Sequence, residues 1–429
     1  MMITYRSTAP LLALTLLAAS AGPVGAYPID AYPETGIARL EGFRLAQEGK
    51  VKGNRLPPGA QLKTADIQLR LLDQPDFEIP QPDAALTKRV TAMLGAEARD
   101  YSISVLDLSD PAKPLYIEHN GSLPRNPGSV GKLMVALALF QTLADLYPDD
   151  IEARKRVLRE AQVTVDNFIH SEHHEVPMWM PEQNRMPRRK LREGDTANLW
   201  SFCDWMLSAS SNGAATMVIK QVVLLRHFGI DYPVEPARAQ AFLRETPVKE
   251  LSELLIGALT EPVTRNGLDV ERLRQGSFFS HNAKRAIPGK NSVATTHELM
   301  RYLVKLEQGK LVDAWSSLEI KRLLYMTQRR IRYASSPALS DAAVFFKSGS
   351  LYRCKPEPDF VCRKYQGNVE NLMNSVAIVE SPAGAPRYYY MVAITSNVKK
   401  KNSAAEHQAL ATRLHALLKG LRPASDVRE

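Results

Sequence analysis

The sequence has few cysteines and, beyond its N-terminal region, no long apolar run. Three cysteines among 429 residues exclude a small scaffold held together by a network of disulfides. After the N-terminal region, no segment approaches the roughly 20 apolar residues that a membrane-spanning helix needs. Apolar residues make up 45% of the chain and charged residues 24%, as in ordinary globular proteins. We therefore expect a soluble protein with a sizeable core.

Neither sign of charge is scarce, because 55 basic and 46 acidic residues give a net charge of +9. No single stretch dominates this charge, although Arg185 to Arg192 is a local basic run. Such a run either attracts an anionic polymer or forms a solvated loop surface. Isolated basic runs are common on solvated surfaces, so we predict no nucleic-acid partner.

The N-terminus has the features of a secretory leader. Arg6 precedes an apolar stretch from Ala9 to Ala19, and the small residues Val24 to Ala26 suit a cleavage site. The stretch is too short to span a bilayer comfortably, and no lipid-accepting cysteine follows it. We interpret residues 1–26 as a signal peptide. The mature protein is then periplasmic or secreted and has no integral membrane segment.

The three cysteines fall into two classes. Cys354 and Cys362 lie eight residues apart in a polar loop, and in an oxidising compartment we expect them to pair. Cys203 lies among apolar residues with no histidine nearby. A buried free thiol is the interpretation we favour there, rather than a nucleophile.

Residues 27–82 form an N-terminal extension, and residues 83–424 form the main domain. The extension is rich in proline and glycine. It contains a short amphipathic stretch at Gly36–Gln47 and a run at Ala65–Leu72 that alternates like a strand. We expect the extension to pack on the main domain, but its purpose is not readable from the sequence.

The order of elements in the main domain predicts an α+β fold. Two strands near its start and three near its end imply one antiparallel sheet flanked by helices. The long helical block between them implies an all-helical lobe, with a substrate cleft between the two parts. The predicted elements are a helix at 83–97, strands at 101–108 and 114–119, the helical block at 129–303, strands at 343–348, 374–380 and 388–395, and a helix at 404–419.

The first chemical motif is Ser129-Val-Gly-Lys132, which opens an apolar helix. A serine at a helix N-terminus meets free backbone N–H groups and the helix dipole, which favour developing negative charge. Three residues later, Lys132 lies on the same helical face, so its amine can reach the hydroxyl and act as the base. A second copy, Ser396-Asn-Val-Lys399, ends a predicted strand and has no partner motifs after it. We treat that copy as chance.

The second motif is Ser210-Ser211-Asn212, between two predicted helices. The Ser210 hydroxyl suits proton relay to a leaving group, and the Asn212 amide suits a substrate carbonyl. A rival copy, Ser280-His281-Asn282, lacks that helical frame. We interpret the rival copy as a solvated turn.

The third motif is Lys347-Ser348-Gly349, continued by Ser350 at the end of an apolar strand. Lys347 can bind a substrate carboxylate, and Gly349 lets an extended substrate lie against the strand. The N–H groups of Ser350 and Ser129 would form an oxyanion hole. Each motif is unspecific alone, but their order and their elements together indicate one site.

These motifs resemble those of class A serine β-lactamases and penicillin-binding D-alanyl-D-alanine peptidases. The resemblance covers about residues 83–421 and includes the helix before Ser210 and the segment from Ala286 to Leu303. It implies a β-lactamase/transpeptidase-like fold. It also implies catalytic Ser129, Lys132, Ser210 and Lys347, and substrate contacts at Asn212, Ser348, Gly349 and Ser350. The implied substrate is a peptidoglycan peptide or a β-lactam, and no cofactor or metal is implied.

Two positions depart from the family pattern. Ser280 stands where class A β-lactamases have the glutamate that activates the deacylating water, and Lys284 stands where an asparagine is usual. Losing a general base typically costs on the order of 10²–10⁴ in rate. Acylation by Ser129 and Lys132 need not suffer.

An insertion between Lys132 and Ser210 contains three histidines within His170–Glu175 and ends near Trp179. The histidine spacing matches no common zinc pattern, so we predict no metal. Trp179 either lines the cleft rim or packs as an ordinary aromatic residue.

The sequence therefore leaves three functions open. The first is a DD-peptidase-like acyl transferase that deacylates slowly. The second is a β-lactamase in which another group activates the water; Glu261 and Glu245 are candidates that the sequence does not place. The third is a sensor or scaffold protein that acylates without turnover. The missing carboxylate at Ser280 favours the first.

Overall fold

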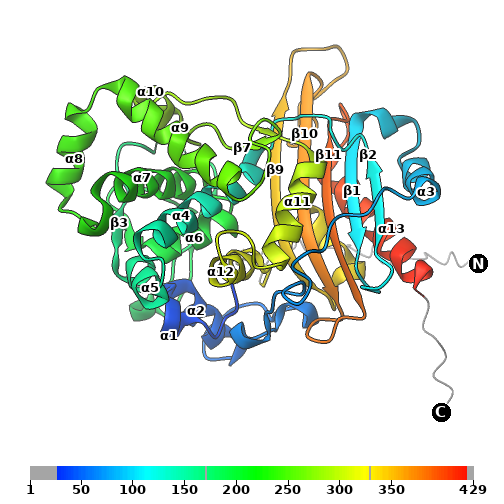
Figure 1. Cartoon of the computed structure of the whole chain (residues 1–429), viewed down its shortest axis with the longest axis horizontal. Helices are drawn as coiled ribbons and strands as arrows, with labels where there is room; N and C mark the ends of the chain where they lie inside the picture. Colours follow the sequence, from blue (N-terminus) through cyan, green and yellow to red (C-terminus); the bar gives the residue numbers. More distant parts are fainter. Residues whose placement is uncertain (1–26, 170–171, 328–329, 423–429) are drawn as a thin grey trace, which may run out of the picture.

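The structure is a computed structural model that describes residues 27–169, 172–327 and 330–422. The predicted signal peptide lies outside these residues. A five-stranded antiparallel sheet stands beside a group of helices (Figure 1). Its strand order is β2-β1-β11-β10-β9, so the two chain ends build one sheet, as predicted. The strands are β1 (Tyr101–Asp107), β2 (Leu115–His119), β9 (Ala343–Arg353), β10 (Glu370–Ser381) and β11 (Tyr388–Ser396).

Side chains that alternate along the strands serve two different cores. Ile103 and Val105 of β1 belong to a core with α3 (Ala84–Leu94) and α13 (Ser403–Leu421). Leu106 of β1 and Met391 of β11 belong to the larger core shared with the helical lobe. Because both faces of the sheet are covered, its central strands β1, β10 and β11 are buried over almost their whole length. Helices α11 (Thr296–Glu307) and α12 (Ala314–Leu324) lie between the sheet and the lobe (Figure 1).

The helical lobe is built around α4 (Lys132–Leu146), an apolar helix that is buried over nearly its whole length. Taken with the preceding turn, Gly128–Leu146 has the length and hydropathy of a membrane span, but 78% of it is buried inside the protein. The burial identifies it as a core helix. The other helices of the lobe are α5 (Ile151–Glu160), α6 (Leu199–Leu207), α7 (Asn212–Phe228), α8 (Pro236–Glu245), α9 (Val248–Arg265) and α10 (His281–Ala286).

The predicted block at 129–303 is not purely helical. Short two-stranded ribbons interrupt it, and two of them carry the insertion between α5 and α6. Polar, charged and proline residues there do not support a helix, so short strand pairs satisfy the backbone instead. The pairs are β3 (Gln162–Thr164) with β6 (Thr196–Asn198), β4 (Glu175–Pro177) with β5 (Arg188–Lys190), and β7 (Leu273–Arg274) with β8 (Val293–Ala294).

The N-terminal extension packs across the helical lobe and the sheet. Arg39 of α2 (Ala38–Gln47) forms an ion pair with Asp204 of α6, and both side chains are fully buried. Arg70 pairs with Glu380 of β10 at 2.8 Å. The amphipathic stretch predicted at Gly36–Gln47 is confirmed by α2, and the short α1 (Tyr32–Thr35) precedes it.

The strand predicted at Ala65–Leu72 is wrong. Its alternating apolar residues are buried as expected, but among the described residues no neighbouring strand is present for the backbone to join. Instead, the N–H of Leu71 donates to the Glu307 carbonyl and the N–H of Arg70 donates to the Glu307 carboxylate. The end of α11 therefore satisfies the backbone groups that a sheet would otherwise satisfy.

The predictions for the cysteines are confirmed. Cys354 and Cys362 form a disulfide, with their Cα atoms 6.1 Å apart, in the loop between β9 and β10. Cys203 is a buried free thiol in α6, and burial raises its pKa. A thiol held neutral in this way is not a nucleophile.

Candidate active site

The nucleophile and base predicted from the first motif are in contact. Ser129 lies in a single 3₁₀ turn, Gly128–Gly131, that leads into α4. Lys132 is the first residue of α4 and is fully buried. Its Nζ lies 2.8 Å from Ser129 Oγ, 3.0 Å from the Ser210 carbonyl oxygen and 2.8 Å from Asn212 Oδ1. A neutral lysine amine has two N–H groups and one lone pair. In Lys132 the two N–H groups can donate to the Ser210 carbonyl and to Asn212 Oδ1, which leaves the lone pair facing the Ser129 hydroxyl.

The environment of Lys132 favours the neutral amine. Burial lowers the pKa of Lys132 to about 7; Glu172 opposes this shift and Arg332 adds to it. The amine also lies 4.4 Å from the centre of the Phe279 ring. Near neutral pH, a large fraction of Lys132 is therefore unprotonated and available to take the proton of Ser129.

The second motif is a tight turn between α6 and α7. Ser210 has a φ of +59°, a left-handed conformation that is uncommon for a residue with a side chain. Ser211 caps α7 by accepting a hydrogen bond from the N–H of Ala214, and its own N–H donates to the Trp205 carbonyl. This turn directs the Ser210 carbonyl and the Asn212 side chain at Lys132.

The third motif lies on β9, an edge strand of the sheet. Lys347 Nζ lies 2.8 Å from Ser210 Oγ and donates to the Ser348 carbonyl at 2.9 Å. Burial, together with the charges of Lys132 and Arg332, lowers the pKa of Lys347 well below its usual value. The two lysines therefore lie on either side of the Ser210 turn, and all three predicted motifs meet.

Gly349 explains how β9 approaches the serine so closely. A Cβ atom at Gly349 would lie 2.3 Å from the Pro127 carbonyl oxygen and 2.6 Å from the Ser129 nitrogen, so no side chain fits there. A Cβ atom at Gly128 would lie 3.2 Å from the Ser350 nitrogen. Ser129 and Ser350 thus present their backbone nitrogens on neighbouring segments, as the predicted oxyanion hole requires.

The sequence analysis missed Arg332. Its guanidinium donates to Ser348 Oγ at 2.9 Å and to Ser350 Oγ at 3.1 Å. It also lies 4.8 Å from the centre of the Tyr365 ring. A cation is therefore held beside both hydroxyls that follow Lys347. The residue type was a possible signal, because the planar guanidinium of arginine suits two-pronged (bidentate) binding of a carboxylate. Nothing in the sequence, however, indicates that Arg332 lies beside β9.

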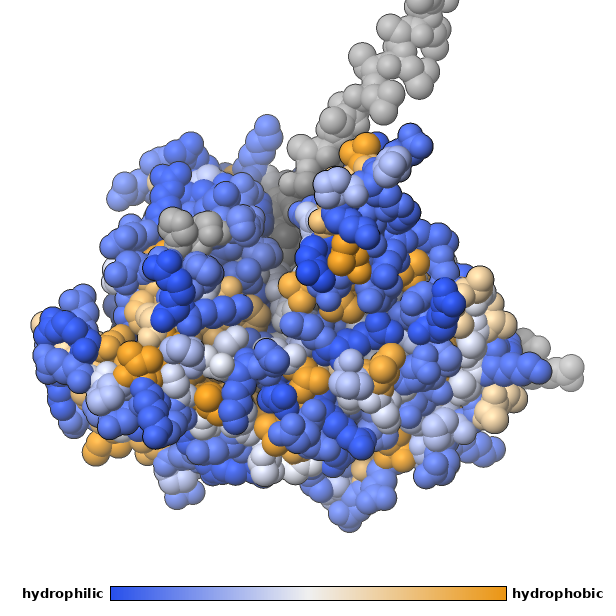
Figure 2. Space-filling view, turned by 90° about the horizontal axis from the view of Figure 1, so that it is seen from above, coloured by the Kyte–Doolittle hydropathy of each residue, from blue (hydrophilic) through white to orange (hydrophobic). Residues whose placement is uncertain are grey.

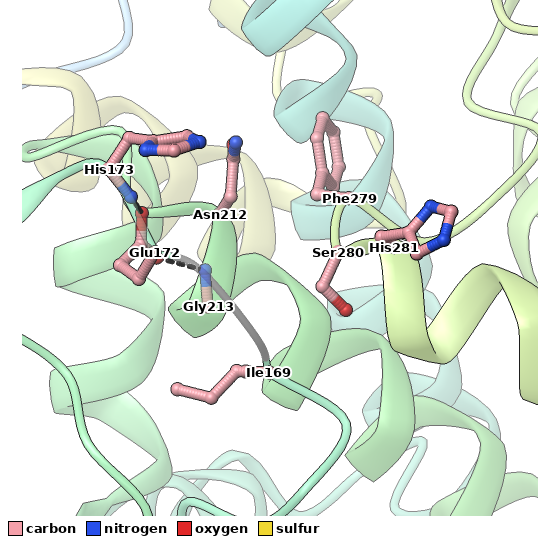
Figure 3. Close-up of a pocket in the computed structure, with 8 residues that line it drawn as sticks. All are labelled: Ile169, Glu172, His173, Asn212, Gly213, Phe279, Ser280 and His281. Atoms are coloured by element: carbon pink, nitrogen blue, oxygen red, sulfur yellow. Dashed lines mark hydrogen bonds between the residues drawn. The ribbon is translucent and has the colours of Figure 1, made fainter.

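Glu172 is the second residue that the sequence analysis missed. It lines a pocket of about 170 Å³ next to the Ser210 turn (Figure 3). Hydrogen bonds from His174 and from the backbone offset the effect of burial, and they hold the pKa of Glu172 at about 2. The remaining lining residues are Ile169, His173, Asn212, Gly213, Phe279, Ser280 and His281.

Ser280 is not in a solvated turn, contrary to the prediction. It caps α10 by accepting a hydrogen bond from the N–H of Ala283, its N–H donates to Thr216 Oγ1, and the residue is 7% exposed. Its hydroxyl also donates to the Phe168 carbonyl. The helix start at Ser280 was missed because α10 is too short to show a helical pattern.

The two carboxylates weighed as alternative bases lie on the protein surface. Glu261 is exposed and pairs with Arg226, and Glu245 is exposed and pairs with Arg244. Neither lines the pocket beside Asn212. The second Ser-x-x-Lys copy is also accounted for, because Ser396 is buried in β11 and bonds to a ring nitrogen of His407 at 2.9 Å.

The described part of the histidine-rich insertion contacts the site. In the described ranges, no group of three or more His, Cys, Asp or Glu residues is placed to hold a metal ion. His170 lies outside these ranges. His174 Nδ1 bonds to Glu172 at 3.1 Å, and His173 lines the pocket. Trp179 packs on α2, where its ring occupies the space beside Gly42.

Comparisons with known proteins agree with this geometry. A model of the beta-lactamase enzyme family matches residues 85–418. A β-lactamase structure from Sphaerobacter thermophilus is 16% identical, covering 80% of this chain and 100% of its own, with a TM-score of 0.50. A class A β-lactamase structure from Bacteroides cellulosilyticus is 14% identical, covering 81% of this chain and 100% of its own, also with a TM-score of 0.50.

A PBP-A variant in an acyl-enzyme complex with penicillin G is 11% identical, covering 80% of this chain and 100% of its own, with a TM-score of 0.48. No curated protein matches the sequence. The two β-lactamase structures share the arrangement of a sheet beside a helical lobe, which confirms the predicted β-lactamase/transpeptidase-like α+β fold.

Proposed function

The chain belongs to the beta-lactamase enzyme family, and within that family we propose that it is a DD-peptidase-like, active-site-serine acyl transferase with slow deacylation. Its substrates are D-alanyl-D-alanine-like peptides, and β-lactams acylate the same serine. The observation that carries the proposal is the contact of Ser129 with a buried Lys132, combined with Ser280 at the position of the usual deacylating carboxylate.

Acylation follows from the contacts of the site. The neutral amine of Lys132 takes the proton of Ser129, and Ser129 Oγ forms a bond to the substrate carbonyl carbon. The backbone N–H groups of Ser129 and Ser350 bind the resulting oxyanion; one such donor is typically worth on the order of 10²–10³ in rate. Ser210, held between Lys132 and Lys347, passes a proton to the leaving nitrogen as the carbon–nitrogen bond breaks.

Recognition of a carboxylate follows from Arg332. D-alanyl-D-alanine peptides and penicillins both carry a carboxylate beyond the bond that breaks. Arg332 holds the hydroxyls of Ser348 and Ser350 at 2.9 and 3.1 Å, next to the amine of Lys347. A planar guanidinium with two hydroxyls and a lysine is suited to bind such a group.

Slow deacylation follows from the state of the carboxylate in the pocket, which is not free to act as a base. In the described part of the chain, the carboxylate in the pocket beside Asn212 is Glu172. Its low pKa of about 2 and its hydrogen bonds from several donors make it a poor proton acceptor at neutral pH. The hydroxyl of Ser280 is engaged with the Phe168 carbonyl. Water therefore attacks the acyl-enzyme without efficient general-base assistance.

We also propose a periplasmic or secreted location, on the basis of the leader-like N-terminus. The disulfide between Cys354 and Cys362 is consistent with an oxidising compartment. The face that carries α10 and the β9–β10 loop is largely hydrophilic, with apolar residues in small separate groups (Figure 2). Such a surface suits a polar peptide substrate.

The test is the intact mass of the protein followed over time after exposure to penicillin, together with D-alanine release from a D-alanyl-D-alanine peptide. We expect an adduct that persists for many minutes and measurable D-alanine release. Ser129→Ala should form no adduct; an adduct on this variant would show that the nucleophile is misassigned. Prompt loss of the wild-type adduct would identify a β-lactamase. A lasting adduct with no D-alanine release would identify a sensor.

A further inference from the structure

The carboxylate of Glu172 joins the insertion to the Ser210 turn. One oxygen, Oε1, accepts hydrogen bonds from the backbone N–H groups of His173 and His174 at 2.8 Å each, and it lies 3.1 Å from His174 Nδ1. The other oxygen accepts from Ser211 Oγ at 2.8 Å and from the N–H of Gly213. Figure 3 shows Glu172 between His173 of the insertion and Gly213 of α7. The Glu172 side chain is only 2% exposed.

We propose that Glu172 is a positioning residue of the reaction: its carboxylate fixes the Ser210–Asn212 turn and supplies the negative charge that acts on the buried Lys132. The inference rests on the proposed acylation of Ser129. No role for Glu172 follows from the three motifs, because it lies in the insertion that separates the first motif from the second.

The geometry of the turn explains why it needs such support. Ser210 has a left-handed backbone, which costs free energy in a residue with a side chain and persists only where neighbours fix it. Ser211, in the middle of the turn, is uncharged. Glu172 accepts from Ser211 and Gly213, on either side of Asn212. A single carboxylate therefore holds the backbone from which Ser210 and Asn212 reach Lys132.

The charge of Glu172 acts in the same place. Burial and Arg332 favour the neutral form of Lys132, while Glu172 favours its protonated form. The other titratable groups nearby are Lys347, which contacts Ser210 and whose pKa burial lowers, and His174, whose pKa is lowered chiefly by burial, so that it is neutral above pH 7. Without Glu172, the remaining effects on Lys132 are burial and Arg332, which both lower its pKa, so the pKa falls further.

Two substitutions separate the position of the carboxylate from its charge. Glu172→Gln keeps the length of the side chain but removes the charge and one acceptor oxygen. Glu172→Asp keeps the charge but is one methylene too short to reach both sides. We expect both to lower the acylation rate constant on the pH plateau by about 10- to 100-fold, the usual effect of misplacing a catalytic group by about 1 Å. Only Glu172→Gln should move the acidic limb of the pH profile to lower pH.

Asp166→Asn is the matched control. Asp166 also ties the insertion to α7, through an ion pair with Lys220, but it does not contact the Ser210 turn. This variant should acylate like the wild type, with an unchanged pH limb. Thermal unfolding of all variants shows which of them are folded. If Glu172→Gln does not fold, Glu172→Asp and Ser211→Ala test the positioning, and Ser211→Ala should give a smaller rate loss.

The experiment measures Ser129 labelling by a fluorescent penicillin between pH 5 and 9. If folded Glu172 variants label at the rate of Asp166→Asn and share its pH limb, the inference is overturned. If the wild type takes up no label, the proposed function has failed instead. In that case the inference is tested by the pKa of Lys132, measured by NMR titration in the wild type and in Glu172→Gln. An unchanged pKa overturns the inference.

Discussion

Lys132 shows how burial, the largest cause of its lowered pKa, turns an ordinary side chain into a base. Its amine has no exposed surface and is surrounded by the Phe279 ring and the oxygens of Ser210 and Asn212. A buried ammonium ion loses its hydration, so burial favours the neutral amine and lowers the pKa. The residue that removes the serine proton therefore does not depend on a neighbouring acid to activate it.

The acylation rate should reflect this property in its pH dependence. Protonated Lys132 cannot accept a proton, so labelling of Ser129 should rise with pH through about 7 and reach a plateau above it, because the pKa of Lys132 is lowered to about 7. Lys132→Arg keeps a cation that stays protonated and should lower the rate by on the order of 10²–10⁴. A flat wild-type profile between pH 5 and 9 would contradict this assignment.

Arg332 should act on substrates that carry a free carboxylate. Arg332→Gln removes a charge-assisted contact, which is typically worth 1.5–3 kcal/mol, so acylation by a free-acid penicillin should fall about 10- to 100-fold. The methyl ester of the same penicillin should react with wild type and variant at similar rates. Equal losses of acylation rate for the free acid and the ester would mean that Arg332 positions β9 rather than binding the substrate carboxylate.

At the scale of elements, the docking of α2 on α6 depends on one buried ion pair. Arg39 and Asp204 have side-chain exposures of 1% and 0%. Arg39→Ala leaves the Asp204 carboxylate buried without this partner, so the free energy of unfolding should fall by about 3–5 kcal/mol. Denaturant titration measures this loss.

Helix α2 also carries an exposed arginine that serves as the control for Arg39. Arg44 forms exposed pairs with Glu41 and Glu48, so Arg44→Ala should cost at most about 1 kcal/mol. The double variant Arg39→Met with Asp204→Leu should recover most of the loss, because an apolar pair of similar volume often replaces a buried ion pair without cost. If Arg39→Ala is no worse than Arg44→Ala, the pair does not stabilise the docking.

Elements were predictable where a local pattern determines them. The strands at both chain ends were predicted correctly, and the three ordered motifs could be found, because each depends on neighbours in the sequence. Ala65–Leu72 alternates like a strand, yet its backbone partner is Glu307, which no local pattern reveals. Glu172 and Arg332 were missed for the same reason, since each gains its role from a distant turn or strand.

At the scale of the whole molecule, residues 27–82 contribute charges that the main domain needs. Arg39 and Arg70 neutralise Asp204 and Glu380, which are buried on α6 and β10. A chain beginning at residue 83 leaves the buried Asp204 without Arg39, at several kcal/mol, whereas Glu380 keeps Lys321 as a partner at 2.7 Å. The loss at Asp204 alone approaches the lower end of the stability of a typical domain, about 5–15 kcal/mol.

We therefore expect residues 83–429 to give little soluble protein and no cooperative thermal unfolding, whereas residues 27–429 fold. Circular dichroism and soluble yield from matched expression distinguish the two. A well-folded protein beginning at residue 83 would show that the extension is dispensable for stability.

The sheet assembled from both chain ends also constrains how the protein folds. Tyr101 of β1 pairs with Ser396 of β11, and Gly349 of β9 packs on the nitrogen of Ser129. Contacts between such distant segments give a high contact order, which slows folding because a long loop must close before the contacts form. The reactive serine is complete only after the last strands have been synthesised and docked. A penicillin should thus label Ser129 only in fully folded molecules, and nascent or partly folded chains should stay unlabelled.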